Sequence, residues 1–359
     1  MRHLRLLFAF TAAAALAACG GGGGDAAPAP TSTPTPAPPA PVPAPPSSTP
    51  VPAPPPPAVG TNGTLQTSVP PANYADARRR AAFAELNAAR LGAGAGLVAQ
   101  SAPLDTSASD HAAYLTTNGF ASASSPHDET AGLPGYTGAD PFTRMESAGY
   151  SFSFATEVIG DIGSSSATSD CVGDLLDTIY HAADMLGRVT DAGFGFGSGG
   201  AAGMCTIDLA SPLADGALQV PPSGAVIAYP YAGQSVAHGT FHVANESPRA
   251  STTLLPNATA GTPILAGFRN EDYVASGSAT ITQFTLADST GAAVPAVILA
   301  DAAITGANVN ADANLGSGFA VLVPTSPLAA GTYTVTLHAS VAGGRALALT
   351  TWTFSVAAP

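Results

Sequence analysis

Lysine is absent from this chain of 359 residues, and its 11 basic residues are all arginine. Charged side chains make up only 10% of the sequence, and 24 acidic residues leave a formal net charge of −13. A nucleic-acid-binding surface needs clustered Lys and Arg to neutralise phosphates, so this class of partner is excluded. The lack of lysine also excludes a P-loop nucleotide site and Schiff-base chemistry on a lysine amine.

The apolar run from Leu6 to Leu16 is far shorter than the roughly 20 residues that a permanent membrane-spanning helix needs. It follows Arg2 and Arg5, and a basic start before a short apolar run is typical of a secretory signal peptide. We therefore expect residues 1–18 to be removed on export.

The apolar run ends in Leu16-Ala17-Ala18-Cys19, which resembles a bacterial lipobox. The resemblance implies that Cys19 is acylated and anchors the chain to a membrane, since acyl chains contribute about 0.8 kcal/mol per buried methylene. Gly20 follows Cys19 in place of an inner-membrane retention Asp, so the implied location is the outer membrane or cell surface, facing the periplasm or the exterior. The alternative is ordinary secretion, with Cys19 incidental to the cleavage site.

Residues 19–71 are predicted to be a disordered linker that begins at the lipidated cysteine. Positions 20–24 are five glycines, and residues 28–57 hold 16 of the 33 prolines. Proline fixes φ and lacks an N–H group, so this tract can form neither helix nor sheet and is expected to be extended polyproline II. It would hold the following domains away from the membrane.

Apolar residues at helical spacing predict helices over 75–91, 104–118 and 169–180, with mostly loop over 120–168. Strands are expected at 194–197 and 204–209. After Pro221 the helical period disappears, and short β-branched runs alternate with turn residues, as in a β-sandwich. These expected strands are 225–229, 281–286, 294–299, 319–323, 332–338 and 350–356.

Eight short segments follow one another in a fixed order between residues 75 and 210. They are Leu86–Arg90, His111–Leu115, Pro126–Glu129, Gly135–Gly138, Arg144–Tyr150, Glu157–Ile159, Tyr180–His181 and Gly193–Gly197. Together they resemble the bacterial form of the CAP superfamily, also called the SCP/PR1-like domain. The resemblance implies an α+β chain, with an α-β-α sandwich over 72–215 followed by an all-β, immunoglobulin-like (Ig-like) sandwich over 222–359.

The same resemblance implies a groove lined by two histidines and two acidic residues. By position His127 and His181 match the histidines, and Glu157 matches the first acid. The aligned position for the second acid is Thr178, which leaves three acidic candidates open. These are Glu129, Asp174 and Asp177. Val158 replaces the family's usual Asn and Tyr180 its usual Gly, so we expect the site to be altered from the family pattern.

Two imidazoles and a carboxylate in one groove could hold Zn²⁺ with an open water position, which would make a hydrolytic centre for peptide or ester bonds. Without metal the same groups could act as a His–Glu acid/base pair. Most members of the resembled family are described as binding ligands, often lipids or sterols. We therefore expect a binding module for a lipid, a small molecule or an envelope ligand, and regard an enzyme as the alternative. A purely architectural role is the third alternative.

The remaining cysteines and histidines are given simpler interpretations. Cys171 and Cys205 form an even pair in an exported chain and are expected to form a disulfide, with two separate buried thiols as the alternative. His111 lies on the apolar face of its predicted helix, so a hydrogen-bonded core histidine is expected. Three further histidines of the C-terminal region are expected to be surface or strand residues without functional companions. They are His238, His242 and His338.

Overall fold

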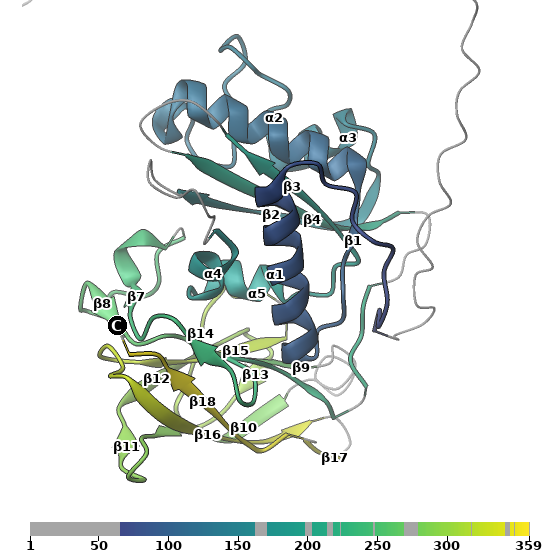
Figure 1. Ribbon diagram of the computed structural model, residues 1–359. Helices are drawn as coiled ribbons and strands as arrows, with labels where there is room; N and C mark the ends of the chain where they lie inside the picture. Colours follow the sequence, from purple (N-terminus) through teal and green to yellow (C-terminus); the bar gives the residue numbers. More distant parts are fainter. Residues whose placement is uncertain are drawn as a thin grey trace, which may run out of the picture. The chain divides into compact units, whose positions relative to one another are not determined.

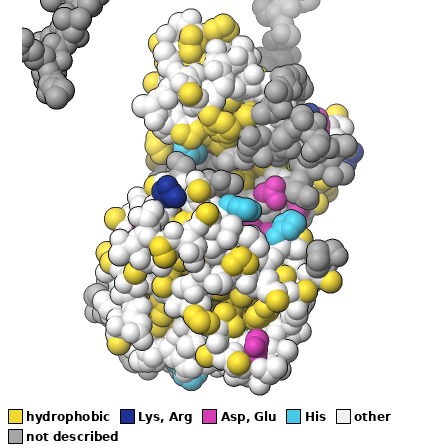
Figure 2. Space-filling view, turned by 90° about the vertical axis from the view of Figure 1, so that its left-hand side faces the viewer, with side chains coloured by type: hydrophobic (Ala, Val, Ile, Leu, Met, Phe, Trp, Pro, Cys, Tyr) yellow, Lys and Arg dark blue, Asp and Glu magenta, His cyan; other side chains and the backbone are white. Residues whose placement is uncertain are grey.

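The structure is a computed structural model in which residues Pro55–Pro359 form one compact unit. The described residues are 65–161, 171–197, 203–213, 218–222, 224–246, 248–268, 279–316, 318–341, 345–347 and 349–358. The predicted signal peptide, Cys19 and nearly all of the predicted linker lie outside these residues. Figure 1 shows the ribbon, and Figure 2 shows the side chains on one face.

The first part of the described chain is a four-stranded sheet with helices on both faces (Figure 1). In spatial order its strands are β1 (Ala99–Gln100), β3 (Asp191–Phe196), β4 (Met204–Pro212) and β2 (Phe152–Asp161). One face carries α2 (Ala102–Asn118) and α3 (Pro141–Ser147), with the short 3₁₀ helix η1 (Phe120–Ser122) after α2. The other face carries α1 (Ala77–Ala93), α4 (Cys171–Leu176) and α5 (Tyr180–Met185).

Local sequence signals explain where the long helices begin and how closely they pack. The Asp76 side chain accepts hydrogen bonds from the backbone N–H groups of Arg78 and Arg79, which caps the start of α1. Gly193 and Gly195 of β3 let the sheet approach α2 directly. A Cβ atom at Gly195 would lie 2.0 Å from the carbonyl oxygen of Ala108, so only glycine fits there.

The C-terminal part consists of two larger sheets and a small hairpin-like pair. The five-stranded sheet contains β14 (Val309–Ala311), β12 (Ala296–Ala300), β15 (Phe319–Pro324), β9 (Ile264–Phe268) and β5 (Val226–Tyr229). The seven-stranded sheet contains β11 (Ala293–Val294), β10 (Ala279–Ala287), β16 (Gly331–Val341), β18 (Thr351–Val356), β6 (Ser235–Val236), β13 (Ile304–Thr305) and β17 (Arg345–Ala346). Strands β7 (Phe241–His242) and β8 (Thr259–Ala260) form a separate pair, and η2 (Val243–Asn245) is a 3₁₀ helix.

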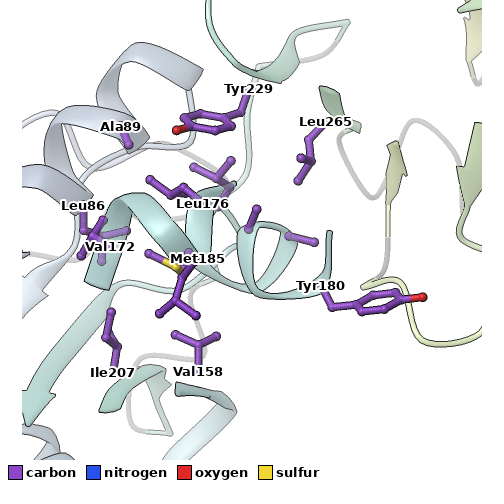
Figure 3. Packing of buried hydrophobic residues seen from close by; sticks show 14 of the residues in the cluster. Leu86, Ala89, Val158, Val172, Leu176, Tyr180, Met185, Ile207, Tyr229 and Leu265 are labelled. Atoms are coloured by element: carbon purple, nitrogen blue, oxygen red, sulfur yellow. The ribbon is translucent and has the colours of Figure 1, made fainter. Parts of the chain in front are cut away.

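Both faces of the five-stranded sheet are buried. Along β15, Phe319 and Val321 belong to the cluster formed with the helices, whereas Ala320 and Leu322 belong to the cluster formed with the seven-stranded sheet. Strand side chains alternate between faces, so one strand contributes to two cores. Figure 3 shows the first cluster, in which helices α1, α4 and α5 lie between β2 and β4 on one side and β5 and β9 on the other.

The expected disulfide is present. Cys171 at the start of α4 is bonded to Cys205 of β4, with the two Cα atoms 6.3 Å apart. Disulfides of this kind persist in oxidising compartments such as the periplasm and the cell exterior. Among the described residues, no helix has both the length and the apolar character needed to cross a bilayer.

The observed elements differ from the expected ones in several places, among them strand β9, for which no strand was expected. The helix expected over 169–180 ends at Leu176 as α4, and a second short helix, α5, begins at Tyr180, where the carboxylate of Glu246 accepts hydrogen bonds from the N–H groups of Ile179 and Tyr180 and so caps the new helix start. The expected loop over 120–168 contains α3 and the ten-residue strand β2. The strand expected over 294–299 is divided at Pro295, which has no N–H group for a sheet ladder.

Candidate functional site

A cavity of about 1250 Å³ opens beside the edge strand β2, the α4–α5 segment and the loop that contains β7. Its apolar wall includes Phe120, Ile159, Leu175, Phe241, Leu328 and Val356. Its titratable lining residues are His127, Asp174, Asp177, His181, His238 and His242. Figure 2 shows histidine and acidic side chains gathered at mid-height on one face, with hydrophobic side chains among them.

His127 lies at the cavity wall with a carboxylate directly behind it. Its Nδ1 atom is 2.9 Å from Oε1 of Glu157, and about a quarter (27%) of the His127 side chain is exposed. An ionised carboxylate only accepts hydrogen bonds, so Nδ1 carries the proton in this pair. In the neutral ring, Nε2 is then the basic nitrogen.

Arg144 fixes the position of both members of this pair. It donates through Nη2 to Oε2 of Glu157 at 2.8 Å and through Nη1 to the carbonyl oxygen of His127 at 2.9 Å. Burial acts to raise the pKa of Glu157, but the hydrogen bond from His127 and the positive charges of His111 and Arg144 lower it to about 2. Glu157 is therefore ionised at all physiological pH values.

A second buried pair supports the first one. His111 of α2 is fully buried, with Nδ1 2.9 Å from Oε1 of Glu129 and Nε2 3.0 Å from the carbonyl oxygen of Pro126. Both partners can only accept hydrogen bonds, so both ring nitrogens donate and the imidazole is cationic. Glu129 also accepts from the backbone N–H of Thr137 at 2.6 Å. Burial acts to raise the pKa of Glu129, but these hydrogen bonds outweigh it and hold the pKa below its ordinary value.

Asp208 lies opposite Glu157 on the neighbouring strand β4 and is fully buried. Its polar neighbours are Ser107 and Glu157, but neither carboxyl oxygen makes a well-aligned hydrogen bond with a described residue. Burial raises the pKa of Asp208 well above its ordinary value, and the negative charge of Glu157 raises it further. Asp208 is therefore a neutral carboxyl group beside an ionised one.

His181 has a different carboxylate partner. Its Nδ1 atom is 3.1 Å from the hydroxyl of Thr178 and 3.3 Å from Oε1 of Glu246. Glu246 belongs to the C-terminal part of the chain, and its side chain is fully buried. Nearby on α5, Asp184 accepts a hydrogen bond from Thr156, and burial raises the pKa of Asp184 to about 6.

The structure thus brings some of the predicted groove residues together and separates others. His127 and His181 line one cavity, and Glu157 contacts His127 but has no described contact with His181. Of the three candidates for a fourth groove residue, Asp174 and Asp177 line the cavity, whereas Glu129 pairs with His111.

The metal expectation stays a prediction. Within the described residues, no group of three or more His, Cys, Asp or Glu side chains is arranged to share a metal ion. Glu157 is already held by Arg144 and His127, so its oxygens are engaged in hydrogen bonds. The Zn²⁺ site expected at His127, His181 and Glu157 therefore draws no support from their geometry.

Sequence reasoning missed two histidines. His238 and His242 were expected to have no companions, but both line the cavity with His127 and His181. Both are exposed and His242 lies on strand β7, as expected. The sequence did not show that they line a cavity together with residues of α4 and β2, more than 50 positions away in sequence. His338 follows the expectation, as it is exposed on β16.

Asp177 is a cavity-lining carboxyl group with a strongly raised pKa. Burial raises its pKa to about 7, and the negative charges of Asp174 and Glu85 contribute in the same direction. Asp177 therefore changes its charge near neutral pH, and its partly buried side chain lines the cavity.

Comparison with known proteins gives no family. No protein-family model matches the chain, and no curated protein matches it. Among solved structures, CopC from Methylosinus trichosporium OB3b is 16% identical over 36% of this chain and 87% of its own, with a TM-score of 0.20. The copper resistance protein PcoC from Escherichia coli is 20% identical over 36% of this chain and 95% of its own, with a TM-score of 0.21. Likenesses at these TM-scores are too weak to bear on fold or function.

Proposed function

We propose that this chain is a ligand-binding protein of the CAP superfamily, held at the bacterial outer membrane or cell surface by a lipid on Cys19. The cavity of about 1250 Å³ is the observation that carries the proposal. Ligand pockets commonly measure about 300–1000 Å³ and combine apolar walls with a few polar groups. The cavity has that mixed lining and enough room for a small organic molecule.

The family assignment is supported by the order of the elements and by one contact. Helices cover both faces of a four-stranded sheet, as an α-β-α sandwich requires, and the predicted groove residues His127 and Glu157 lie 2.9 Å apart. The two packed sheets after residue 222 support an Ig-like module. The lipobox resemblance at Cys19 and the disulfide between Cys171 and Cys205 support an exported, anchored protein.

The test is binding of phenylnaphthylamine, an uncharged probe that fluoresces in apolar sites, to the purified chain. We expect saturable binding of one probe per chain. The variant Thr240→Trp fills part of the cavity lining and should weaken binding at least tenfold, because Thr240 is half-buried in the wall. Thr285→Trp is the matched control, since Thr285 is exposed on β10 and does not line the cavity. Equal binding by both variants would contradict the proposal.

Hydrolysis is the second candidate, because His127 and Glu157 form a hydrogen-bonded pair at the cavity wall. In this reaction Nε2 of His127 would take a proton from water as the water oxygen attacks an ester or peptide carbonyl, and would pass that proton to the leaving alkoxide or amine as the C–O or C–N bond breaks. Turnover of nitrophenyl acetate by the wild type, reduced about a hundredfold in His127→Gln with folding intact, would favour it. Equal background rates for both proteins would leave ligand binding as the function.

A further inference from the structure

The described lining of the cavity contains carboxylates but no arginine. Among its described lining residues are two aspartates, Asp174 and Asp177, and four histidines, but no arginine. Glu85 of α1 adds a third carboxylate close to Asp177. The formal net charge of −13 adds a long-range field of the same sign.

The apolar wall lies beside these carboxylates. Phe120, Phe241 and Leu175 line the cavity together with Asp174 and Asp177. Aromatic faces attract cations through their quadrupole, and an apolar wall contributes by removing the ligand's hydrocarbon surface from water. Carboxylates and aromatic rings in one cavity are thus complementary to a positively charged group on an apolar body.

We infer that the cavity selects organic cations, namely molecules with an apolar body and a protonated amine or quaternary ammonium group that lies near Asp174 and Asp177. The inference rests on the proposed ligand-binding function and adds the chemical class of the ligand. It also excludes fatty acids and phosphate esters as preferred ligands, because their anionic groups would meet two carboxylates and no arginine among the described lining residues.

The state of Asp177 gives this selectivity a pH dependence. Its pKa is raised to about 7 by burial and by Asp174 and Glu85, so it is partly protonated at neutral pH. A bound cation favours the ionised carboxylate, and affinity should rise as the pH is raised through 7. The other titratable groups that face Asp177 or share the cavity are Asp174, Glu85, Tyr229, His127, His181, His238 and His242.

The experiment compares three fluorescent probes on the full chain at pH 6 and pH 8. Berberine is a permanent organic cation, anilinonaphthalene sulfonate is an anion, and phenylnaphthylamine is neutral. The variants are Asp177→Asn and Asp174→Asn, each of which removes one lining charge. Glu146→Gln is the matched control, because Glu146 is an exposed carboxylate on α3 that does not line the cavity.

At pH 8 we expect berberine to bind at least tenfold more tightly than the anion. We also expect the affinity for berberine to be at least about threefold higher at pH 8 than at pH 6. Each aspartate variant should weaken berberine binding about tenfold without changing the neutral probe, whereas Glu146→Gln should change neither. Because Asp174 is exposed, Asp174→Asn keeps the test valid if the other variant folds poorly. Equal affinity for cation and anion would overturn the inference while the neutral probe still binds. Failure of all three probes would overturn the proposed function as well.

Discussion

Four ionised side chains lie together in the interior behind His127. Cationic His111 and Arg144 face anionic Glu129 and Glu157, and all four are buried. Buried charges are tolerated when they are paired and hydrogen-bonded, and this set is balanced. A fifth charge beside them would have no counterpart, which explains why Asp208 is neutral.

The neutral state of Asp208 should make the stability of the protein depend on pH. Its pKa is raised in the folded state, so its contribution to stability is fully present below the unfolded-state pKa of about 3.9 and is lost as the pH rises towards the folded-state value. In Asp208→Asn this loss is absent. Relative to the variant, the wild type should lose unfolding free energy as the pH rises above the unfolded-state pKa, with a limiting slope of about 1.4 kcal/mol per pH unit.

Urea unfolding at pH 5, 6 and 7 measures this difference. Glu146→Gln serves as the control, because an exposed carboxylate has a similar environment in the folded and unfolded states. Its unfolding free energy should run parallel to that of the wild type at every pH. Parallel curves for Asp208→Asn would show that Asp208 is ionised in the folded protein.

The sequence permitted only part of this network to be predicted. His127 and Glu157 could be named from the family resemblance, and His111 from its place on an apolar helix face. Arg144 was named only as the start of a segment that resembles the family. Its contact with Glu157 at 2.8 Å was not predicted, because an interior ion pair depends on two segments meeting in space. The predicted groove of His127, His181 and Glu157 likewise did not include Glu246, which lies against His181 and is 65 positions further along the chain.

At the scale of elements, the spacing of apolar residues predicted correctly those helices that bury a single face. Helices α1 and α2 lie within two residues of the expected 75–91 and 104–118, because their apolar residues recur at helical spacing. Strand β2 was missed because part of it is exposed at the edge of the sheet and carries little apolar alternation. The break between α4 and α5 depends on the distant carboxylate of Glu246.

The disulfide fastens the short helix α4 to β4, and its removal should be costly. Closing a loop between residues 34 positions apart restricts the unfolded chain, and such a crosslink contributes about 3–4 kcal/mol. The double variant Cys171→Ala/Cys205→Ala should therefore lose about that much unfolding free energy in urea. Reduction of the wild type should produce a similar loss, and reductant should leave the double variant unchanged. A variant as stable as the oxidised wild type would contradict the expected contribution.

At the scale of the whole described unit, the N-terminal and C-terminal parts are joined by hydrogen bonds and by a common hydrophobic cluster. Tyr180 of α5 donates a hydrogen bond to Asp312 at 2.7 Å, and Glu246 caps the same helix. Leu265 and Tyr229 from the five-stranded sheet lie in the same hydrophobic cluster as Leu86 and Leu176 (Figure 3). The cavity is also lined from both parts, so its lining depends on their contact.

A shared cluster predicts one cooperative unfolding transition for the two parts. Leu265 is fully buried on β9, and Leu265→Ala should lower the unfolding free energy by about 2–5 kcal/mol. Trp352, the only tryptophan, reports on the C-terminal sheets through its fluorescence. Far-ultraviolet circular dichroism reports on the helices. All described helices except η2 precede residue 190, so this signal reports on the N-terminal part. Both signals should shift to lower urea by the same amount.

Leu213→Ala is the control, because Leu213 is 62% exposed and its loss should change stability by less than about 0.5 kcal/mol. A shift confined to the Trp352 signal would mean that the two parts unfold independently and that the shared cluster contributes little to stability.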